Sequence, residues 1–284
     1  MSEINLQDIR LDGRVVIMTG ADRGLGRTMS LGLAQAGATV MLASPAVEGL
    51  KAVASEIEAL GSGSALVNFV DIADLGSCRE LVQATLKQVG RIDVLVNNAR
   101  RLSRGPGLPP QGNKLPLNET DPEIYRETVN VNVIGTFFMS RAAVESFLVQ
   151  GKGKIINITT SVWHAYSRHD SPYGVTKAAI EASTQIWARD LERMGITVNS
   201  LLPGGSADSD PEKLKDPGKV LLPADIMNPL IVWLASEYSN GVTGCRFVGK
   251  KWDSSLPPDD AAQASREEPV FQGQPIGTFA IRSA

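Results

Sequence analysis

The stretch RVVIMTGADRGLG, residues 14–26, joins a short β-branched run to three closely spaced glycines. An amphipathic stretch, GRTMSLGLAQAG at 26–37, follows directly. A strand that turns through glycines into a helix presents free N–H groups and the positive end of the helix dipole, which suits a phosphate. In such a turn Gly20 permits the bend, Gly24 lets the backbone approach a pyrophosphate, and Gly26 allows close helix–strand packing. A glycine-rich turn without a ligand is the alternative, but the strand-to-helix context favours a dinucleotide site.

Outward from this stretch, short apolar runs alternate with amphipathic segments of helical length. Further strands are expected at 39–44, 64–71, 93–99, 154–160 and 197–204, and helices at 47–61, 78–90 and, as two longer segments, roughly 121–149 and 172–194. Strands spaced by helices are typical of βαβ units, hence of a parallel sheet with helices on both faces. We therefore predict an α/β fold with a single doubly wound, Rossmann-type parallel-sheet domain over residues 1–253, which includes the catalytic site.

Two stretches interrupt this alternation. Residues 100–114 are rich in proline, glycine and cations and are expected to form a loop. Residues 254–284 form a C-terminal extension with a sparse apolar set: Val270, Phe271, Ile276, Phe279 and Ile281. The extension is interpreted either as a disordered tail or as an arm that packs on a neighbouring subunit, because its apolar residues would otherwise be exposed.

Composition excludes several classes of protein. The 284 residues are 43% hydrophobic, and 28 Lys+Arg against 31 Asp+Glu give a net charge of −3, so no basic surface for nucleic acid is expected. Two cysteines and two histidines are too few for a disulfide scaffold or a Cys/His metal cluster, so no metal is predicted. The polar start and the lack of a long apolar run predict no signal peptide, no membrane span and a cytoplasmic location.

The end of the second predicted strand bears on which nicotinamide cofactor fits. NAD sites usually place an acidic residue there to hold the ribose 2′-hydroxyl, whereas this chain has Ala43-Ser44-Pro45. Arg23, in the glycine turn, and Ser44 are candidates to contact a 2′-phosphate, although Asp22 partly neutralises the charge beside Arg23. We expect NADP(H) to be preferred, with NAD(H) as the alternative.

A tyrosine and a lysine stand four residues apart near the start of the second long helical segment. Residues at i and i+4 share a helix face, so Tyr173 and Lys177 can point into one site. An ammonium about 5 Å from a phenol favours the phenolate by roughly 3 kcal/mol at an effective dielectric near 20, which suits acid–base catalysis. Most such pairs are surface residues; the glycine turn, Asn132 and an upstream strand that ends in hydroxyl residues favour a catalytic role here.

Taken together, these motifs resemble those of the short-chain dehydrogenase/reductase family over roughly residues 10–253. Five blocks fall in that family's order: the glycine turn at 19–26, Asn97-Asn98-Ala99, Asn132, Tyr173 with Lys177, and Pro203-Gly204. The resemblance implies an NAD(P)-dependent oxidoreductase that transfers hydride between the nicotinamide and a ketone or secondary alcohol, that is, a carbonyl reductase or alcohol dehydrogenase.

The resemblance also implies roles for the catalytic residues. Tyr173 would exchange a proton with the substrate oxygen, and Lys177 would favour its phenolate and hold the nicotinamide ribose. Asn132 would position a water for proton relay. A hydroxyl thirteen residues before the tyrosine normally bonds the substrate carbonyl; this count gives Thr160, with the adjacent Ser161 as the alternative.

By the same resemblance, the cofactor and substrate would contact further residues. Asp71 and Ile72 would flank the adenine. The full cofactor set is Gly20, Arg23, Gly24, Leu25, Gly26, Ser44, Asp71, Ile72, Asn98, Ala99, Tyr173, Lys177, Pro203 and Gly204. Ser161, Trp163 and Tyr166 would wall the substrate pocket, with simple packing as the alternative for the two aromatic residues, and a short substrate lid is expected at about 204–220.

Two departures from the family pattern concern substrate class more than fold. Arg100 replaces a glycine after Asn98-Ala99, and Gly249-Lys250-Lys251 replaces a C-terminal glycine pair. Arg100, Arg101, Arg104 and Lys114 favour an anionic substrate or a carrier-linked acyl chain if they line the pocket, and are otherwise a solvated loop.

Alternatives to the oxidoreductase remain at this point. One is a non-catalytic NAD(P)-binding regulatory or scaffold protein on the same fold. Another is a relative that dropped the nucleotide for a reaction such as dehalogenation, but such proteins usually lose the lysine and the glycine turn. The expected partners are a small carbonyl or alcohol substrate and further copies of the chain. We expect a homodimer or homotetramer that pairs through the segments around 121–149 and 172–194, since their apolar surface exceeds what one sheet face needs.

Overall fold

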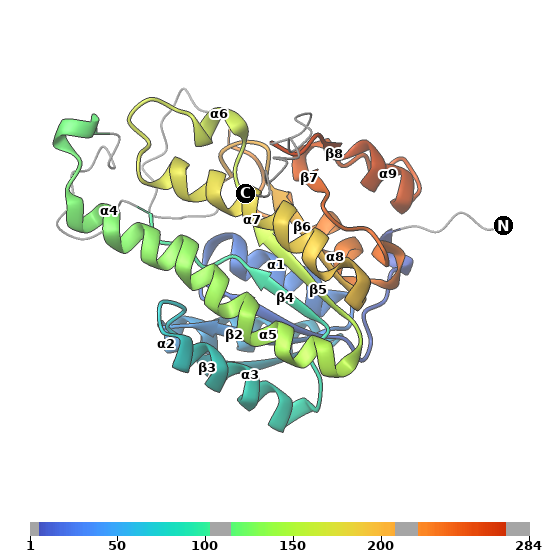
Figure 1. The fold of residues 1–284 in the computed structure, drawn as a ribbon. Helices are drawn as coiled ribbons and strands as arrows, with labels where there is room; N and C mark the ends of the chain where they lie inside the picture. The colour runs from blue at the N-terminus through green and yellow to red at the C-terminus, as the bar shows by residue number, and fades with distance from the viewer. Residues whose placement is uncertain (1–5, 103–114, 208–220, 271–284) are drawn as a thin grey trace, which may run out of the picture.

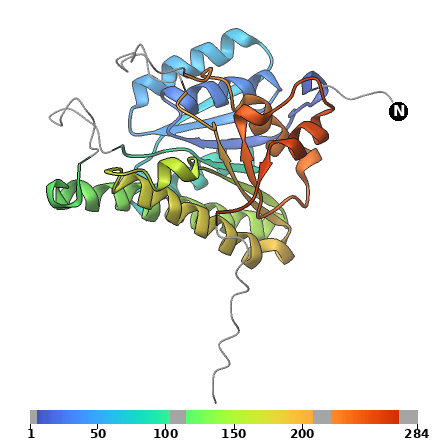
Figure 2. The ribbon, with the colours of Figure 1, turned by 90° about the horizontal axis from the view of Figure 1, so that it is seen from above.

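A parallel sheet with helices on both faces forms the molecule, as predicted (Figures 1 and 2). The computed structural model describes residues 6–102, 115–207 and 221–270. The strands are β1 (Val15–Thr19), β2 (Thr39–Ser44), β3 (Ser64–Phe69), β4 (Val94–Asn97), β5 (Gly153–Ile158), β6 (Ile196–Leu202), β7 (Arg246–Val248) and β8 (Arg266–Glu267). Their order is β3-β2-β1-β4-β5-β6-β7-β8, and only β8 runs antiparallel to its neighbour.

The helices divide between the two faces of the sheet. They are α1 (Gly24–Gln35), α2 (Val47–Leu60), α3 (Leu75–Val89), α4 (Pro122–Val129), α5 (Thr136–Gln150), α6 (Val162–Ala165), α7 (Tyr173–Leu191), α8 (Asn228–Ala235) and α9 (Pro258–Ala264). One apolar cluster joins α1, α2 and α8 to the sheet, and a second joins α3, α5 and α7 to the opposite face. No helix in the described ranges is long and apolar enough to cross a membrane.

The central strands are apolar throughout because both of their faces are covered. Every residue of β1 is buried, and successive side chains enter different clusters: Val16 and Met18 pack with α1, whereas Ile17 packs on the other face. This two-sided burial explains why the sequence shows continuous β-branched runs instead of strict alternation.

The position of the site follows from the strand order. β1 pairs with β2 on one side and with β4 on the other, so the chain order reverses between β1 and β4. In open parallel sheets, ligands bind outside the carboxyl ends of the strands at such a reversal. The glycine turn follows β1 at this edge, and residues 98–102 follow β4 beside it.

Part of the predicted C-terminal extension packs on its own domain. Ala261 and Ala262 of α9 are buried, and β8 pairs with β7, with Glu267 opposite Arg246. A hydrogen bond of 2.7 Å from Trp233 Nε1 to an Asp259 carboxylate oxygen fixes α9 on α8. Residues 254–267 therefore pack on the domain to which they belong. The apolar residues at 271, 276, 279 and 281 lie outside the described ranges.

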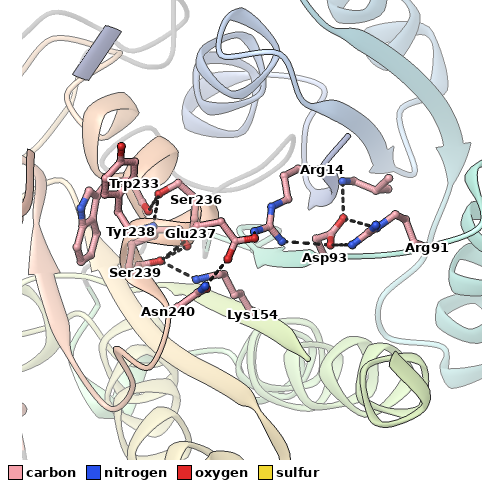
Figure 3. Close-up of polar contacts among 12 residues, drawn as sticks. Arg14, Arg91, Asp93, Lys154, Trp233, Ser236, Glu237, Tyr238, Ser239 and Asn240 are labelled. Carbon is pink, nitrogen blue, oxygen red and sulfur yellow. Dashed lines mark hydrogen bonds and ion pairs between the residues drawn. The ribbon is translucent and has the colours of Figure 1, made fainter. Parts of the chain in front are cut away.

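A polar network occupies the opposite, amino-terminal edge of the sheet (Figure 3). Asp93, just before β4, accepts a hydrogen bond from Val15 N at 2.9 Å and forms ion pairs with Arg14 and Arg91. Arg14 also pairs with Glu237, in the turn after α8. Nearby, buried Lys154 of β5 donates from Nζ to Ser239 Oγ at 2.8 Å. This network ties the starts of three strands to the end of α8, away from the edge where ligands are expected.

Candidate active site

Three glycines form a tight cradle between β1 and α1. Gly20 adopts a φ of +65°, in the left-handed region that favours glycine, and a Cβ there would lie 2.8 Å from the Cα of Ala99. At Gly26 a Cβ would lie 2.0 Å from the carbonyl oxygen of Gly20. A larger residue at either position would therefore displace the neighbouring backbone.

The cradle is braced by the end of β4. Asn98 Nδ2 donates to the carbonyl oxygens of Thr19 and Gly20, at 2.9 and 3.0 Å. Thr19 Oγ1 accepts from the backbone nitrogens of Asn98 and Ala99, both at 3.1 Å. Asn98 and Ala99 therefore hold the glycine turn in place, a function that the sequence alone did not assign to them.

The residues of the cradle fit a dinucleotide. Helix α1 begins at Gly24, and its N-cap residue, Arg23, makes no side-chain cap hydrogen bond, so the first N–H groups of the helix have no capping acceptor. Leu25, next along, packs against the core beneath and holds the helix on the sheet. An uncapped helix N-terminus above close-packed glycines is the arrangement that binds a pyrophosphate.

The predicted adenosine-side residues lie at the ends of β2 and β3. Ser44 is buried, and its Oγ accepts from Ala46 N at 3.0 Å, which leaves the hydroxyl hydrogen free for another acceptor. Arg23 is 86% exposed, with its Nε 3.7 Å from the Asp22 carboxylate. Asp71 is exposed and accepts from Ala73 N, whereas Ile72 is buried. The Asp22 carboxylate thus holds the Arg23 side chain only loosely.

Tyr173 and Lys177 come together on the first turn of α7. The Lys177 ammonium lies 5.8 Å from the centre of the Tyr173 ring, as the i,i+4 spacing predicts. Lys177 is buried and donates to the carbonyl oxygen of Ile158, the last residue of β5, at 2.6 Å. Burial, followed by the positive charge of Arg100, lowers the pKa of Lys177 from 10.5 to about 7.

Thr160 and Ser161 follow β5 but differ in what their groups contact. The Ser161 hydroxyl caps α6: its Oγ accepts from His164 N at 3.3 Å and lies 2.8 Å from His164 Nδ1. The carbonyl oxygen of Thr160 accepts from Arg246 at 3.0 Å, which fixes its backbone. Among the described residues, no hydrogen bond occupies the Thr160 hydroxyl, whereas that of Ser161 is engaged locally.

Asn132 lies in a π-helical segment, Asn130–Gly135, between α4 and α5. Its Oδ1 accepts from Arg101 N at 2.7 Å, and its Nδ2 donates to Arg101 O at 3.0 Å and to Thr176 Oγ1 at 3.1 Å. The side chain therefore ties the segment after β4 to α7. Single π-helical turns inside α-helices are frequent at functional sites, which agrees with a site at this position.

Arg100 enters the same site. Its Nη1 lies 3.5 Å from the Tyr173 phenol oxygen, and its guanidinium carbon lies 6.0 Å from the ring centre. The sequence identified Arg100 as a departure from a family pattern but did not predict that its side chain reaches the tyrosine.

The predicted substrate wall is open. Trp163 and Tyr166 are 88% and 63% exposed. On the other side, Pro203 accepts from Lys250 N at 3.0 Å, and Gly204 has a φ of +91°. Most of the expected lid, from residue 208 to 220, lies outside the described ranges, as do Arg104 and Lys114.

One buried arginine beneath the site, Arg246, was not predicted as a site residue from the sequence. Arg246 is 1% exposed and contacts Glu181, Glu267 and the Thr160 carbonyl. The sequence pattern that could have indicated it is a single arginine within the short apolar run CRFVG, because a charged side chain is buried in such a run only when it has charged or hydrogen-bonding partners.

Comparison with known proteins agrees with this geometry. Residues 14–216 match the family described as short chain dehydrogenase. The 2-dehydro-3-deoxy-D-gluconate 5-dehydrogenase of Escherichia coli is 32% identical over 253 residues, 84% of this chain and 94% of that protein. The 3-oxoacyl-(acyl-carrier-protein) reductase of Thermotoga maritima is 30% identical over 246 residues, 83% of this chain and 96% of the relative. A short chain dehydrogenase of Shigella flexneri, solved in complex with NADP, superposes with a TM-score of 0.75 at 26% identity and covers 86% of this chain and 99% of that one.

Proposed function

Because this chain belongs to the short-chain dehydrogenase/reductase family of oxidoreductases, we propose that it is an NADP(H)-preferring carbonyl reductase or alcohol dehydrogenase acting on a small ketone or secondary alcohol. The observation that carries this proposal is the placement of Tyr173 and Lys177 at the carboxyl edge of the sheet, on the same edge as the uncapped glycine cradle. Such an arrangement lets one site bind a dinucleotide and exchange a proton with a substrate oxygen.

The bound nicotinamide would supply or accept the hydride, and the chain's own residues would manage the oxygen of the substrate. Tyr173 donates its phenolic proton to the carbonyl oxygen during reduction and takes it back during oxidation. Lys177, when protonated, favours the phenolate that remains. The Thr160 hydroxyl, which has no hydrogen-bond partner among the described residues, donates to the same oxygen and orients the carbonyl. Asn132 fixes the backbone of Arg101 and thereby the wall of the site.

The preference for NADP(H) is supported by the end of β2. Ser44 stands where a carboxylate would repel a 2′-phosphate, and the guanidinium of Arg23 is 86% exposed and weakly held. The Shigella flexneri structure contains NADP, which agrees with this assignment for a protein of the same fold.

A homodimer or homotetramer is also part of the proposal. Phe137 of α5 is 47% exposed and Ile186 of α7 is 55% exposed, and the rings of Phe137 and Trp187 lie 6.4 Å apart, so the two helices share an apolar surface. An isologous contact would bury such a surface against its own copy. We also propose a cytoplasmic location for the protein.

The test is a panel of ketones and secondary alcohols with both nicotinamide cofactors, applied to the wild type, to Tyr173→Phe and to Tyr238→Phe. We expect Tyr173→Phe to reduce turnover about 10²–10⁴-fold, because it removes only the acid–base group, and to bind cofactor as the wild type does. Tyr238→Phe, far from the site, should turn over normally. If Tyr173→Phe kept more than about a tenth of the wild-type rate, proton transfer by this phenol would be excluded.

A further inference from the structure

Arg100 presents a guanidinium to the oxygen at which chemistry is expected. Its Nη1 lies 3.5 Å from the Tyr173 phenol oxygen, at the outer limit of a hydrogen bond. The guanidinium also lies over the tyrosine ring, with its carbon 6.0 Å from the ring centre. A group in this position would be adjacent to any carbonyl that accepts a hydrogen bond from the phenol.

The backbone that carries Arg100 is fixed on both sides. Before it, Ala99 N donates to Thr19 Oγ1 at 3.1 Å. After it, Arg101 donates to and accepts from the Asn132 side chain, at 2.7 and 3.0 Å. Because the neighbours on either side are held by hydrogen bonds to other elements, the direction in which the side chain leaves the backbone is set by the fold.

The charge around the phenol is unbalanced. Arg100 forms no ion pair with any residue in the described ranges, whereas the adjacent Arg101 pairs with Glu127. The second cation at the ring, Lys177, is buried, and the charge of Arg100 contributes to the lowering of its pKa. The nearest carboxylate on α7, Glu181, already binds Arg246 and Ser200. Within the described residues, the guanidinium of Arg100 therefore faces the tyrosine without a carboxylate partner.

We propose, building on the proposed function, that Arg100 binds a carboxylate of the substrate, so that the enzyme acts on ketones or secondary alcohols whose carboxylate carbon lies two bonds from the reacting carbon, as in 3-oxo and 3-hydroxy acids. The planar guanidinium matches a carboxylate through two parallel hydrogen bonds. Two carbon–carbon bonds span roughly 2.5 Å, so a carboxylate at this distance reaches Arg100 while the ketone oxygen contacts Tyr173. The carboxylate also supplies the missing negative charge.

This proposal separates free oxo acids from their neutral derivatives. A 3-oxo acid and its methyl ester have nearly the same shape and the same reacting carbonyl, but only the acid carries the charge. The natural comparison is therefore acetoacetate and benzoylacetate against their methyl esters, which test a small and a bulky substituent.

The experiment measures binding, so that it does not depend on turnover. Isothermal titration of the four compounds into protein saturated with oxidised nicotinamide cofactor would be carried out on the wild type, Arg100→Gln, Arg100→Lys and Arg101→Gln. We expect at least one acid to bind the wild type ten- to a hundred-fold more tightly than its ester. Arg100→Gln should abolish this difference by weakening only the acid, and Arg100→Lys should restore part of it. Arg101→Gln removes an equal charge one residue away and should preserve the difference.

Three results would overturn the proposal. The wild type could bind neither acid more tightly than its ester, or bind none of the four compounds. Arg100→Gln could weaken the binding of acid and ester equally, or Arg101→Gln could weaken acid binding as much as Arg100→Gln does. The proposed function is tested separately, by comparing the cofactor-dependent turnover of the wild type with that of Tyr173→Phe. Acid binding that depends on Arg100, without turnover of any compound in the ketone and alcohol panel, would retain the carboxylate site at Arg100 and reject the proposed reductase or dehydrogenase activity.

Discussion

The buried guanidinium of Arg246 donates from Nη2 to the carbonyl oxygen of Thr160 over 3.0 Å. Its Nε donates to Glu181 of α7 at 3.1 Å, and its remaining nitrogen pairs with Glu267 of β8. One side chain thus connects the end of β5, the helix that carries Tyr173, and the last strand of the sheet. The position of Thr160 in the site therefore depends on residues far from it in the sequence.

Replacement of Arg246 should destabilise the protein strongly. Arg246→Met leaves the Glu181 carboxylate, itself 3% exposed, without its cationic partner, and removing one member of a buried ion pair costs about 3–5 kcal/mol. Urea unfolding would measure the loss. Lys251→Met is the control, because it removes only the half-exposed partner of Glu267 and should change the free energy of unfolding by less than about 1 kcal/mol. A loss for Arg246→Met no larger than for the control would contradict this reading of the network.

Thr160→Ala should lower turnover more than Ser161→Ala. The Thr160 hydroxyl is free to donate to a substrate oxygen, and removal of one such donor typically costs about 10²–10³-fold in rate. The Ser161 hydroxyl caps α6, so its loss should cost about 1 kcal/mol of stability and affect rate only mildly. Steady-state kinetics of both variants, with Thr160→Ser as the conservative control that should retain activity, distinguishes them. The reverse order would transfer the substrate contact to Ser161.

The parts of the fold that the sequence predicted are those with strong local patterns. The apolar run before Gly20 and the amphipathic stretch after Gly26 differ in period, so the strand, the turn and the helix were each visible. The parallel doubly wound arrangement followed from repeats of the same alternation, and the structure confirms it. Tyr173 and Lys177 meet because their spacing matches the helix turn.

Features set by pairing between distant segments were not predictable in this way. β7 and β8 contain only three and two residues, too few for a periodic signal, and they form because β8 returns to pair with β7. The sequence consequently did not predict that residues 254–267 pack on their own domain. Likewise, the π-helical segment at 130–135 and the reach of Arg100 toward Tyr173 depend on tertiary contacts that leave no local pattern.

Lys154 should make stability rise with pH above neutrality. Burial, with the charge of Arg14, lowers the pKa of Lys154 from 10.5 to about 8. Below pH 8 the amine is protonated in both the folded and unfolded states; between about 8 and 10.5 only the unfolded state holds the proton. The contribution of Lys154 to the free energy of unfolding therefore rises across this window, by up to about 1.4 kcal/mol per pH unit.

Chemical unfolding of the wild type, Lys154→Met and Lys152→Met between pH 7.5 and 9.5 would test this. In Lys154→Met the slope of the free energy of unfolding against pH should be smaller than in the wild type, because the contribution of Lys154 is lost, whereas the exposed Lys152 is a matched control whose replacement should keep the wild-type slope. Lys177, whose pKa is also lowered, contributes the same rise in all three proteins and cancels in the comparison. Parallel pH curves for Lys154→Met and the wild type would show that Lys154 is not the responsible group.

Light scattering at micromolar concentration should show a dimer or tetramer. Ile186→Glu places a charge in the apolar surface shared by α5 and α7 and should shift the mass toward the monomer, because an unpaired charge cannot be buried in an interface without a large penalty. Leu60→Glu, a similarly exposed position on α2 at the opposite face, should leave the mass unchanged. A monomeric wild type would exclude the proposed assembly, and an equal effect of both variants would place the interface elsewhere.

Cofactor choice should depend on Arg23 and Ser44. No carboxylate closes β2, so a 2′-phosphate meets no repulsion there, while the exposed guanidinium of Arg23 offers hydrogen bonds to it. Because that arginine is largely solvated, the contact should contribute about 1–1.5 kcal/mol, roughly a tenfold difference in affinity. Fluorescence titration should therefore show NADPH bound more tightly than NADH.

Arg23→Ala should erase most of the gap and leave NADH affinity nearly unchanged, whereas Ser44→Asp should reverse the preference by accepting the ribose hydroxyls and repelling the phosphate. The Asp22 carboxylate lies 3.7 Å from Arg23 Nε, so Asp22→Asn should widen the gap by freeing the guanidinium. Equal or tighter binding of NADH by the wild type would overturn the assignment to NADP(H).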